Sequence, residues 1–178
     1  EAGVQDWPLD DVVQLLKTGA APRGTAMGPM AEVVFGSTQH LADADLRAMA
    51  VFLKELPRHD PPAPRPVAAT SESLALGARI YGNQCAQCHG KQGEGAGDAY
   101  PALAGHRTVT MNSSANLLRV ILIGGFPPTT PGNPRPFGMP PFGQSLTDTE
   151  IAAVASYVRS SWGNAAPSVQ ALDVQKVR

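Results

Sequence analysis

The stretch Cys85-Ala-Gln-Cys88-His89 places two thiols three residues apart and an imidazole directly after the second thiol. This pattern, Cys-x-x-Cys-His, is the attachment signature of a c-type haem. On a helical turn the two thiols project towards one side and can form thioethers with two vinyl groups, and the histidine then places its ring under the iron. Because the chain has only 2 cysteines, we expect one covalently attached haem c, with His89 as an axial ligand.

Two other uses of a cysteine pair fit the sequence less well. A structural zinc site needs about four ligands, yet the chain has no second cysteine pair, and His40, His59 and His106 are scattered. A thioredoxin-like redox pair would need a βαβ setting, which the helical pattern of this chain does not offer.

Two methionines after the motif are candidates for the second axial ligand, Met111 and Met139. Histidine and methionine are the usual axial ligands in electron-transfer haem proteins. Met139 lies in Phe137-Gly-Met-Pro-Pro-Phe-Gly143, where two prolines limit the entropy of the loop. Met111 follows Thr-Val-Thr, without such rigidity, and packing in the core is the alternative for either side chain. We therefore favour Met139 as the metal ligand opposite His89.

Hydrophobic periodicity predicts three helices after residue 70. The first covers residues 73–84, and the second covers the apolar run 116–123, for which a buried strand is the alternative. The third begins at a capping box, Thr147-Asp-Thr-Glu150, and ends near Gly163. The Gly-, Pro- and Phe-containing loop 124–145 is long for a compact domain, which indicates a functional role.

Composition excludes several classes of protein. With 43% hydrophobic residues the chain can form a packed core, and 14 Lys and Arg against 15 Asp and Glu leave no basic stripe for nucleic acid. No apolar run approaches the roughly 18 residues of a transmembrane segment. The chain begins with neither Met nor a signal sequence, so we expect a mature chain or a piece of a longer one.

A proline-rich stretch, Pro57 to Pro66, predicts an extended linker. We expect a helical segment at 1–56, the linker at 57–69, a haem domain at 70–164 and a tail at 165–178.

The two sides of the linker share an internal repeat. Shifted by 105 positions, residues 12–19 lie over 117–124 and residues 41–46 lie over 146–151. Residues 1–56 therefore match the second half of the haem domain but lack the haem motif. Chance similarity between short amphipathic helices is the alternative.

The order of these features resembles class I cytochrome c: a helix, Cys-x-x-Cys-His, Pro101-Ala-Leu-Ala-Gly105, a helix, a Met-Pro-x-Phe loop and a last helix. The resemblance implies an all-α fold, a small helical bundle around a covalently bound haem, here preceded by a partial cytochrome-like segment without haem. It also implies that the first and last helices cross with Gly77 against an aromatic residue, and Tyr81 and Tyr157 fit that crossing.

The same resemblance implies two further haem-binding residues. The carbonyl of Pro101 would accept a hydrogen bond from the ring of His89 and so fix the imidazole. Arg119 would pair with a haem propionate, and an ordinary exposed arginine is the alternative.

A narrower resemblance covers nearly the whole chain. Five stretches carry it: Gly28 to Val34, the linker, Met139-Pro-Pro-Phe, Tyr157 to Asn164 and the tail ending Lys176-Val-Arg178. They are similar to multihaem cytochrome c subunits of bacterial periplasmic or membrane-bound dehydrogenases that act on alcohol, aldehyde or gluconate. In such an alignment Met30 is the axial ligand of a preceding domain whose motif is absent. The chain is then a fragment or carries a haem-free appendage, and we expect ordinary core packing for Met27 and Met30.

These observations predict a one-electron carrier and not an enzyme. An iron bound by His89 and Met139 has no open position for substrate. The resemblance implies electron transfer from a dehydrogenase large subunit towards quinone, another cytochrome or an oxidase. Covalent haem attachment indicates the bacterial periplasm or the periplasmic face of the inner membrane. The alternative is a catalytic haem domain, peroxidase-like or sulfur-oxidising, with a displaceable sixth ligand.

Residues 1–56 are also a candidate docking element. Without a haem of its own this segment would expose apolar side chains such as Val12, Leu15, Val33 and Phe35. We expect these side chains to be covered by each other, by the haem domain or by another chain, and self-association through this segment is one such arrangement.

Overall fold

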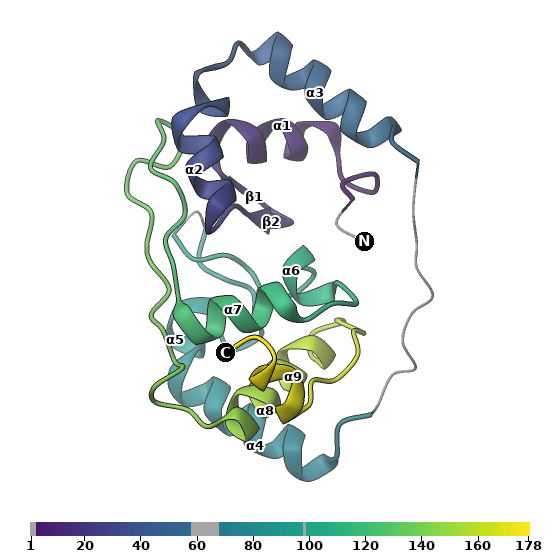
Figure 1. Cartoon of the computed structure of the whole chain (residues 1–178), viewed down its shortest axis with the longest axis vertical. Helices are drawn as coiled ribbons and strands as arrows, with labels where there is room; N and C mark the ends of the chain where they lie inside the picture. The colour runs from purple at the N-terminus through teal and green to yellow at the C-terminus, as the bar shows by residue number, and fades with distance from the viewer. Residues whose placement is uncertain (1–2, 58–67, 98) are drawn as a thin grey trace. The chain divides into compact units, whose positions relative to one another are not determined.

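The computed structural model describes residues 3–57, 68–97 and 99–178 (Figure 1). Most of the predicted proline-rich linker, residues 58–67, lies outside the described residues. The chain forms two compact units. We call Glu1–Pro61 with Gly125–Gly138 the N-terminal unit, and Pro62–Gly124 with Met139–Arg178 the C-terminal unit.

The N-terminal unit is built on α1 and α3, which pack against each other around Trp7, Val12 and Ala50. A short antiparallel hairpin pairs Ala20 with Thr25. Its elements in chain order are α1 (Leu9–Thr18), β1 (Ala20–Ala21), β2 (Gly24–Thr25), α2 (Pro29–Gly36), the 3-10 helix η1 (Thr38–His40) and α3 (Asp43–Glu55).

The tip of the long loop belongs to this unit. The hydroxyl of Thr130 donates a hydrogen bond to the carbonyl of Thr18 (3.0 Å), at the end of α1. The ring of Pro128 fills the space beside Gly19, where a Cβ would lie 2.1 Å from the proline Cγ. The predicted loop 124–145 is therefore divided: residues 125–138 pack in the N-terminal unit, and the loop re-enters the C-terminal unit at Met139.

The C-terminal unit is a helical bundle in which α4 packs along α8. At the crossing, a Cβ on Gly77 would lie 2.2 Å from the carbonyl oxygen of Ala153, and the rings of Tyr81 and Tyr157 are 5.6 Å apart. The implied contact between a glycine and aromatic residues is thus present. Its elements are α4 (Ser71–Gln84), α5 (Ala86–His89), α6 (Arg107–Thr110), α7 (Ala115–Ile123), α8 (Asp148–Ser160) and α9 (Ala171–Gln175).

The three predicted helices are confirmed within a few residues. The apolar run 116–123 is helical, as α7, and not a strand. The capping box at the start of α8 is present in full, because the Thr147 side chain accepts from the Glu150 N–H and the Glu150 carboxylate accepts from the Thr147 N–H. The short helix α9 in the tail was not predicted.

One buried arginine, Arg159, fastens the end of α8 to its surroundings. Its side chain is 1% exposed. The guanidinium donates hydrogen bonds to the carbonyls of Val109 (2.9 Å), Met111 (2.8 Å), Asn112 (3.2 Å) and Pro167 (2.7 Å). The positive charge is therefore solvated by backbone carbonyls that would otherwise lack partners after the short helix α6.

The repeat seen in the sequence extends to the helix bounds. Moved by the same 105 positions, α3 coincides with α8 at both ends, and α1 ends where α7 ends. Gly19 and Gly124, which follow these two helices, both have positive φ angles, +81° and +65°. The side chains at matching positions differ in environment: Tyr157 packs against Tyr81, whereas Phe52 on α3 is 63% exposed.

Several apolar side chains of the N-terminal unit face solvent. Met30 on α2 is 52% exposed, so the expectation of ordinary core packing for Met30 is wrong. Of the side chains expected to be covered, Val12 is buried and Leu15 packs beside it, while Val33 and Phe35 are exposed. The physical reason is that α2 is a short helix whose buried side is occupied by Val34 alone. In the described part of the chain, no helix is both long and apolar enough to span a bilayer.

Candidate haem site

The two thiols and the imidazole of the motif lie on one helical turn at the junction of α4 and α5. The N–H of Cys85 still bonds to the carbonyl of Tyr81 (2.9 Å), which continues α4. The carbonyl of Cys85 accepts from the N–H groups of Cys88 (3.2 Å) and His89 (2.9 Å). Both cysteines are free and partly buried. This arrangement presents the three side chains that the motif requires as one rigid group.

His89 is held by the carbonyl of Pro101. The ring Nδ1 lies 2.9 Å from that oxygen. Burial lowers the pKa of His89, and the hydrogen bond to Pro101 partly opposes this shift. The ring is therefore neutral at neutral pH, with Nδ1 donating to Pro101 and the lone pair on Nε2 available for a metal. The contact is the one that the resemblance implies, and its role towards haem stays a prediction.

The loop between His89 and Pro101 is tied to itself. The N–H of Gly95 donates to the carbonyl of His89 (2.8 Å), and the N–H of Leu103 donates to the carbonyl of Gly93 (2.7 Å). Gly95 has a φ angle of +72°, and a Cβ there would lie 2.8 Å from the carbonyl carbon of Pro101. Only glycine permits this approach, which brings Pro101 back over the histidine.

The described residues around the two cysteines do not form a cluster of metal ligands. Burial, and after it the neighbouring Cys88, raises the pKa of Cys85 to about 11, so the thiol is protonated at neutral pH. Over residues 3–57, 68–97 and 99–178, His, Cys, Asp and Glu side chains nowhere gather in threes that could hold a metal ion. The zinc alternative thus has no support from the described residues.

Met139 lies at the point where the long loop re-enters the C-terminal unit. Its side chain is partly buried and packs on the same hydrophobic core as Cys85. Gly124 has a φ angle of +65° and lies close to the backbone of Met139. A Cβ on Gly124 would lie 2.3 Å from the Met139 carbonyl oxygen, so only glycine fits at this position. The N–H groups of Phe142 and Gly143 donate to the last turn of α7, to Ile121 (2.9 Å) and to Leu122 (3.0 Å).

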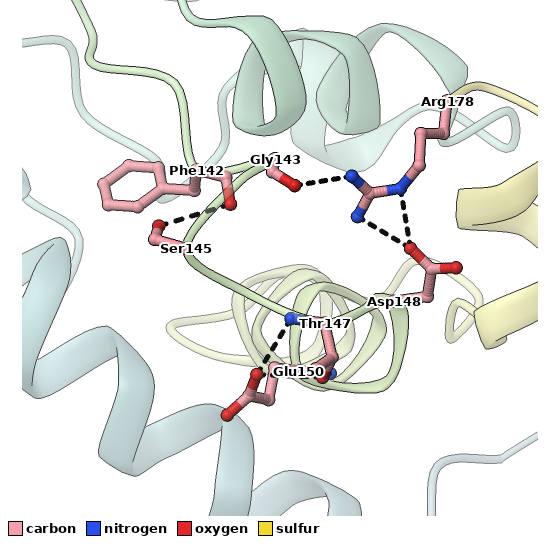
Figure 2. Close-up of polar contacts among 7 residues, drawn as sticks. All are labelled: Phe142, Gly143, Ser145, Thr147, Asp148, Glu150 and Arg178. Carbon is pink, nitrogen blue, oxygen red and sulfur yellow. Dashed lines mark hydrogen bonds and ion pairs between the residues drawn. The ribbon is translucent and has the colours of Figure 1, made fainter.

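Further bonds attach this loop to the start of α8 (Figure 2). The guanidinium of Arg178 bonds to the carbonyl of Gly143 and forms an ion pair with Asp148 (2.7 Å). The hydroxyl of Ser145 donates to the carbonyl of Phe142 (3.3 Å). The backbone that follows Met139 is therefore fixed to both α7 and α8, which leaves little freedom at Met139 itself.

The other two predicted residues lie in less specific surroundings. Met111 follows α6, and its carbonyl accepts from Arg159 (2.8 Å). Its side chain is not among those described as packing with Cys85 and Met139 on the main core. Arg119 is exposed on α7. The structure thus gives Met139 a fixed position beside the core and gives Met111 a backbone role.

The sequence did not predict several contacts around the motif. Tyr81 donates from its hydroxyl to the carbonyl of Gly90 (2.6 Å), just after the histidine. The ring of Trp162 packs against Gly93, where a Cβ would lie 2.5 Å from it. His106 is buried, and burial, together with the nearby His89, lowers its pKa to about 4. A single sequence carries no signal for these contacts, because each joins residues that no short motif relates.

A family model described as Cytochrome c matches residues 74–162, half of the chain, with the helix crossing and the motif inside the match. The chain belongs to the cytochrome c family. A cytochrome c-552 of Thermus thermophilus agrees, with 36% identity over 95 residues, which cover 51% of this chain and 71% of that protein.

Longer relatives match the whole chain. The cytochrome c subunit of alcohol dehydrogenase (quinone) from Gluconobacter oxydans is 37% identical over 188 residues, covering 100% of this chain and 39% of that subunit. The fructose dehydrogenase cytochrome subunit of Gluconobacter japonicus is 34% identical over 205 residues, covering 100% and 42%. The chain thus spans about two fifths of the length of these relatives.

The resemblance predicted from the motifs is therefore confirmed. The chain is a mostly helical, class I type cytochrome c, and its longer relatives are named as cytochrome subunits of dehydrogenases. Membership of this family implies covalently bound haem c and electron transfer through it. The residues present fit that group: two thiols and a neutral imidazole, whose Nδ1 is bonded to the Pro101 carbonyl, lie on one turn.

Proposed function

We propose that this cytochrome c carries one electron at a time through a single haem c, bound by Cys85 and Cys88 and ligated by His89 and Met139. The observation that carries the proposal is the hydrogen bond from His89 Nδ1 to the carbonyl of Pro101 (2.9 Å). It fixes the tautomer and the orientation of a neutral imidazole whose Nε2 can only serve as a ligand or as an acceptor.

The chain's own residues supply the attachment and the ligand geometry. Haem c, when bound, supplies an iron that alternates between ferrous and ferric states. Cys85 and Cys88 would anchor it covalently from one side of a helical turn. His89 would bind from the side that Pro101 fixes. A neutral thioether from Met139 and the surrounding apolar core would favour the less charged, reduced site and raise the potential.

The fixed loop at Met139 supports an electron carrier over the catalytic alternative. A displaceable sixth ligand requires a backbone that can move away from the metal. Here the backbone from Met139 onward is confined, by the close approach of Gly124 to the Met139 carbonyl and by the hydrogen bonds of Phe142 and Gly143 to α7. Little reorganisation between oxidation states would favour fast one-electron transfer. Arg119, exposed on α7, is proposed as a partner of a haem propionate.

The electron donor we propose is a dehydrogenase subunit, with quinone, another cytochrome or an oxidase as acceptor. Relatives that match the full length are named as cytochrome subunits of alcohol, fructose and gluconate dehydrogenases. Because these names share the dehydrogenase partner and differ in the substrate, the proposal concerns the class of donor alone. We place the protein in the bacterial periplasm or at the periplasmic face of the inner membrane.

For the domain organisation we propose a cytochrome-like half at residues 1–56 without haem, a linker at 57–69, the haem domain at 70–164 and a tail at 165–178. The common bounds of α3 and α8 after the 105-residue shift support the half-domain. The exposed Met49 and Phe52 lie on one face of α3, with the exposed Leu56 directly after the helix, and we propose that this face mediates self-association.

The experiment that tests haem attachment is intact-mass measurement of the chain produced in a bacterium with haem-attachment machinery. We expect the mass of one covalent haem. Cys85→Ala or Cys88→Ala should leave one thioether, which shifts the absorption maximum of the haem measured in its complex with pyridine. The double variant should lose covalent haem. A wild-type chain that carries no covalent haem under these conditions would contradict the proposal.

A further inference from the structure

Asn164 lies in the segment that leaves α8, far from the haem motif in the sequence, and is 6% exposed. Its side-chain NH2 donates to the carbonyls of Leu103 (3.1 Å) and Val158 (2.8 Å), and its oxygen accepts from the N–H of Gly105 (2.8 Å). The amide thereby ties the loop that follows Pro101 to the last turns of α8.

These bonds reach His89 through one short piece of backbone. Leu103 and Gly105 come two and four residues after Pro101, whose carbonyl bonds to His89 Nδ1. On its other side the same backbone is tied to Gly93, which accepts from the N–H groups of Leu103 (2.7 Å) and Ala104 (3.0 Å). The position of the Pro101 carbonyl is thus set from two directions, by its own loop and by Asn164.

The segment that carries Asn164 is itself held in an uncommon conformation. Trp162 has φ +55°, a left-handed value that is rare for a bulky residue, and Gly163 follows with φ +85°. Through this turn the Trp162 ring contacts Gly93 while the Asn164 amide reaches Leu103 and Gly105. Such strain persists only where the surroundings determine the conformation, and here it aims two side chains at the two ends of one loop.

We infer that Asn164 is a positioning residue for the proximal histidine. By holding the loop after Pro101, it fixes the hydrogen bond between the Pro101 carbonyl and the His89 ring and so sets the reduction potential of the bound haem. This inference rests on the proposed ligation by His89. A carbonyl that accepts from the far nitrogen of a ligating imidazole raises the basicity of that ligand. A more basic ligand stabilises ferric over ferrous iron and keeps the potential lower.

The test compares Asn164→Ala and Asn164→Ser with Ser160→Ala, all as haem-loaded full chains. Ser160, the last residue of α8, is a matched control, because its hydroxyl donates hydrogen bonds to two carbonyls of that helix, at Ser156 (2.8 Å) and Tyr157 (3.3 Å). We expect the midpoint potential to rise in Asn164→Ala and to rise less in Asn164→Ser, where a hydroxyl replaces the amide and can still form a hydrogen bond. Ser160→Ala should match the wild type. A merely structural role would lower thermal stability without moving the potential.

A second measurement needs no variant. In the reduced wild-type protein, hydrogen exchange of the His89 Nδ1–H and of the Gly105 N–H should give the same free energy of opening once each rate is divided by the intrinsic rate of that group, because one local opening exposes both. If the Gly105 N–H opens at a much lower free energy than the His89 Nδ1–H, the hydrogen bonds of Asn164 do not control the position of the histidine and the inference is wrong.

The outcomes separate the two proposals. A wild-type chain without the spectrum of histidine and methionine ligation would overturn the proposed function. A wild-type chain with that spectrum, in which Asn164→Ala leaves the potential at the Ser160→Ala value, would overturn only the role of Asn164.

Discussion

The side chain of Met139 is partly buried against the main core, and its backbone carbonyl lies close to Gly124. Met139→Ala should keep covalent haem, open the iron to added ligands such as cyanide, and lower the midpoint potential, because a neutral thioether that favours reduced iron is lost. Met111→Ala is the matched control. Its carbonyl bond to Arg159 does not depend on its side chain, so its spectrum and potential should stay those of the wild type. The reverse pattern would make Met111 the ligand.

His106 should make the folded state sensitive to mild acid. Burial lowers its pKa from 6.5 to about 4, so between these values the unfolded chain binds a proton that the folded chain does not. The free energy of unfolding should therefore fall as the pH drops from about 6.5 to about 4, by on the order of 3 kcal/mol. Urea unfolding of the haem-loaded chain across this range, compared with His106→Gln, checks the effect. An equal loss of stability in His106→Gln would assign it to other groups.

At the residue scale the sequence predicted the motif and its chemistry but not its supports. Cys85, Cys88 and His89 are adjacent in sequence, so their spacing alone indicates a haem. The hydrogen bond from Pro101 could be expected only through the family resemblance. Asn164 and Trp162 could not be expected at all, because their contacts with Gly105 and Gly93 depend on how α8 ends, which no local pattern encodes.

At the scale of elements, the crossing of α4 and α8 depends on Gly77. A Cβ there would lie 2.2 Å from the Ala153 carbonyl oxygen, which belongs to the backbone and cannot rotate away. Gly77→Ala should therefore cost about 3 kcal/mol of unfolding free energy, at the upper end of typical overpacking. Thermal and urea unfolding of the haem-loaded protein measure this loss.

Gly82→Ala is the control for this crossing, because Gly82 lies on the same helix with open space around it. An alanine there should stabilise the helix by roughly 0.5–1 kcal/mol. If both variants have the same stability, the close approach at Gly77 does not hold the helices together.

Helix prediction succeeded where the sequence carries a start and a periodic face. The Thr147–Glu150 capping box located α8, and glycine after an apolar run located the end of α7. The short helices α6 and α9 have four and five residues, which is too few to show a period. The division of the loop was also beyond prediction, since it depends on Thr130 and Pro128 meeting the end of α1.

At the scale of the whole molecule, the exposed face of α3 should cause self-association. Met49 and Phe52 lie three residues apart on α3, Leu56 follows the helix, and Phe52 is 63% exposed. Two copies of the chain can pack through this face about a twofold axis, so that the same apolar patch is buried on both copies. Phe52→Glu should shift the sedimentation coefficient towards that of a monomer, while Leu172→Glu, at an exposed position on α9, should not. A monomeric wild-type chain at high concentration would contradict this use of the face.

The domain organisation was predicted from the repeat and the linker. The 105-residue shift located α3 and α8 at matching bounds, because helix caps and apolar faces are encoded locally. It did not reveal that Phe52 is exposed where Tyr157 is packed, since the environment of a side chain depends on which helices are present to cover it.

A potentiometric titration of the haem-loaded chain, followed by its absorption spectrum, is the decisive measurement of ligation by His89 and Met139. We expect a single one-electron transition, together with a weak sulfur–iron band at the red end of the oxidised spectrum that disappears in Met139→Ala. An oxidised wild-type spectrum without that band, or one that added cyanide changes at once at low concentration, would contradict an electron carrier ligated by His89 and Met139.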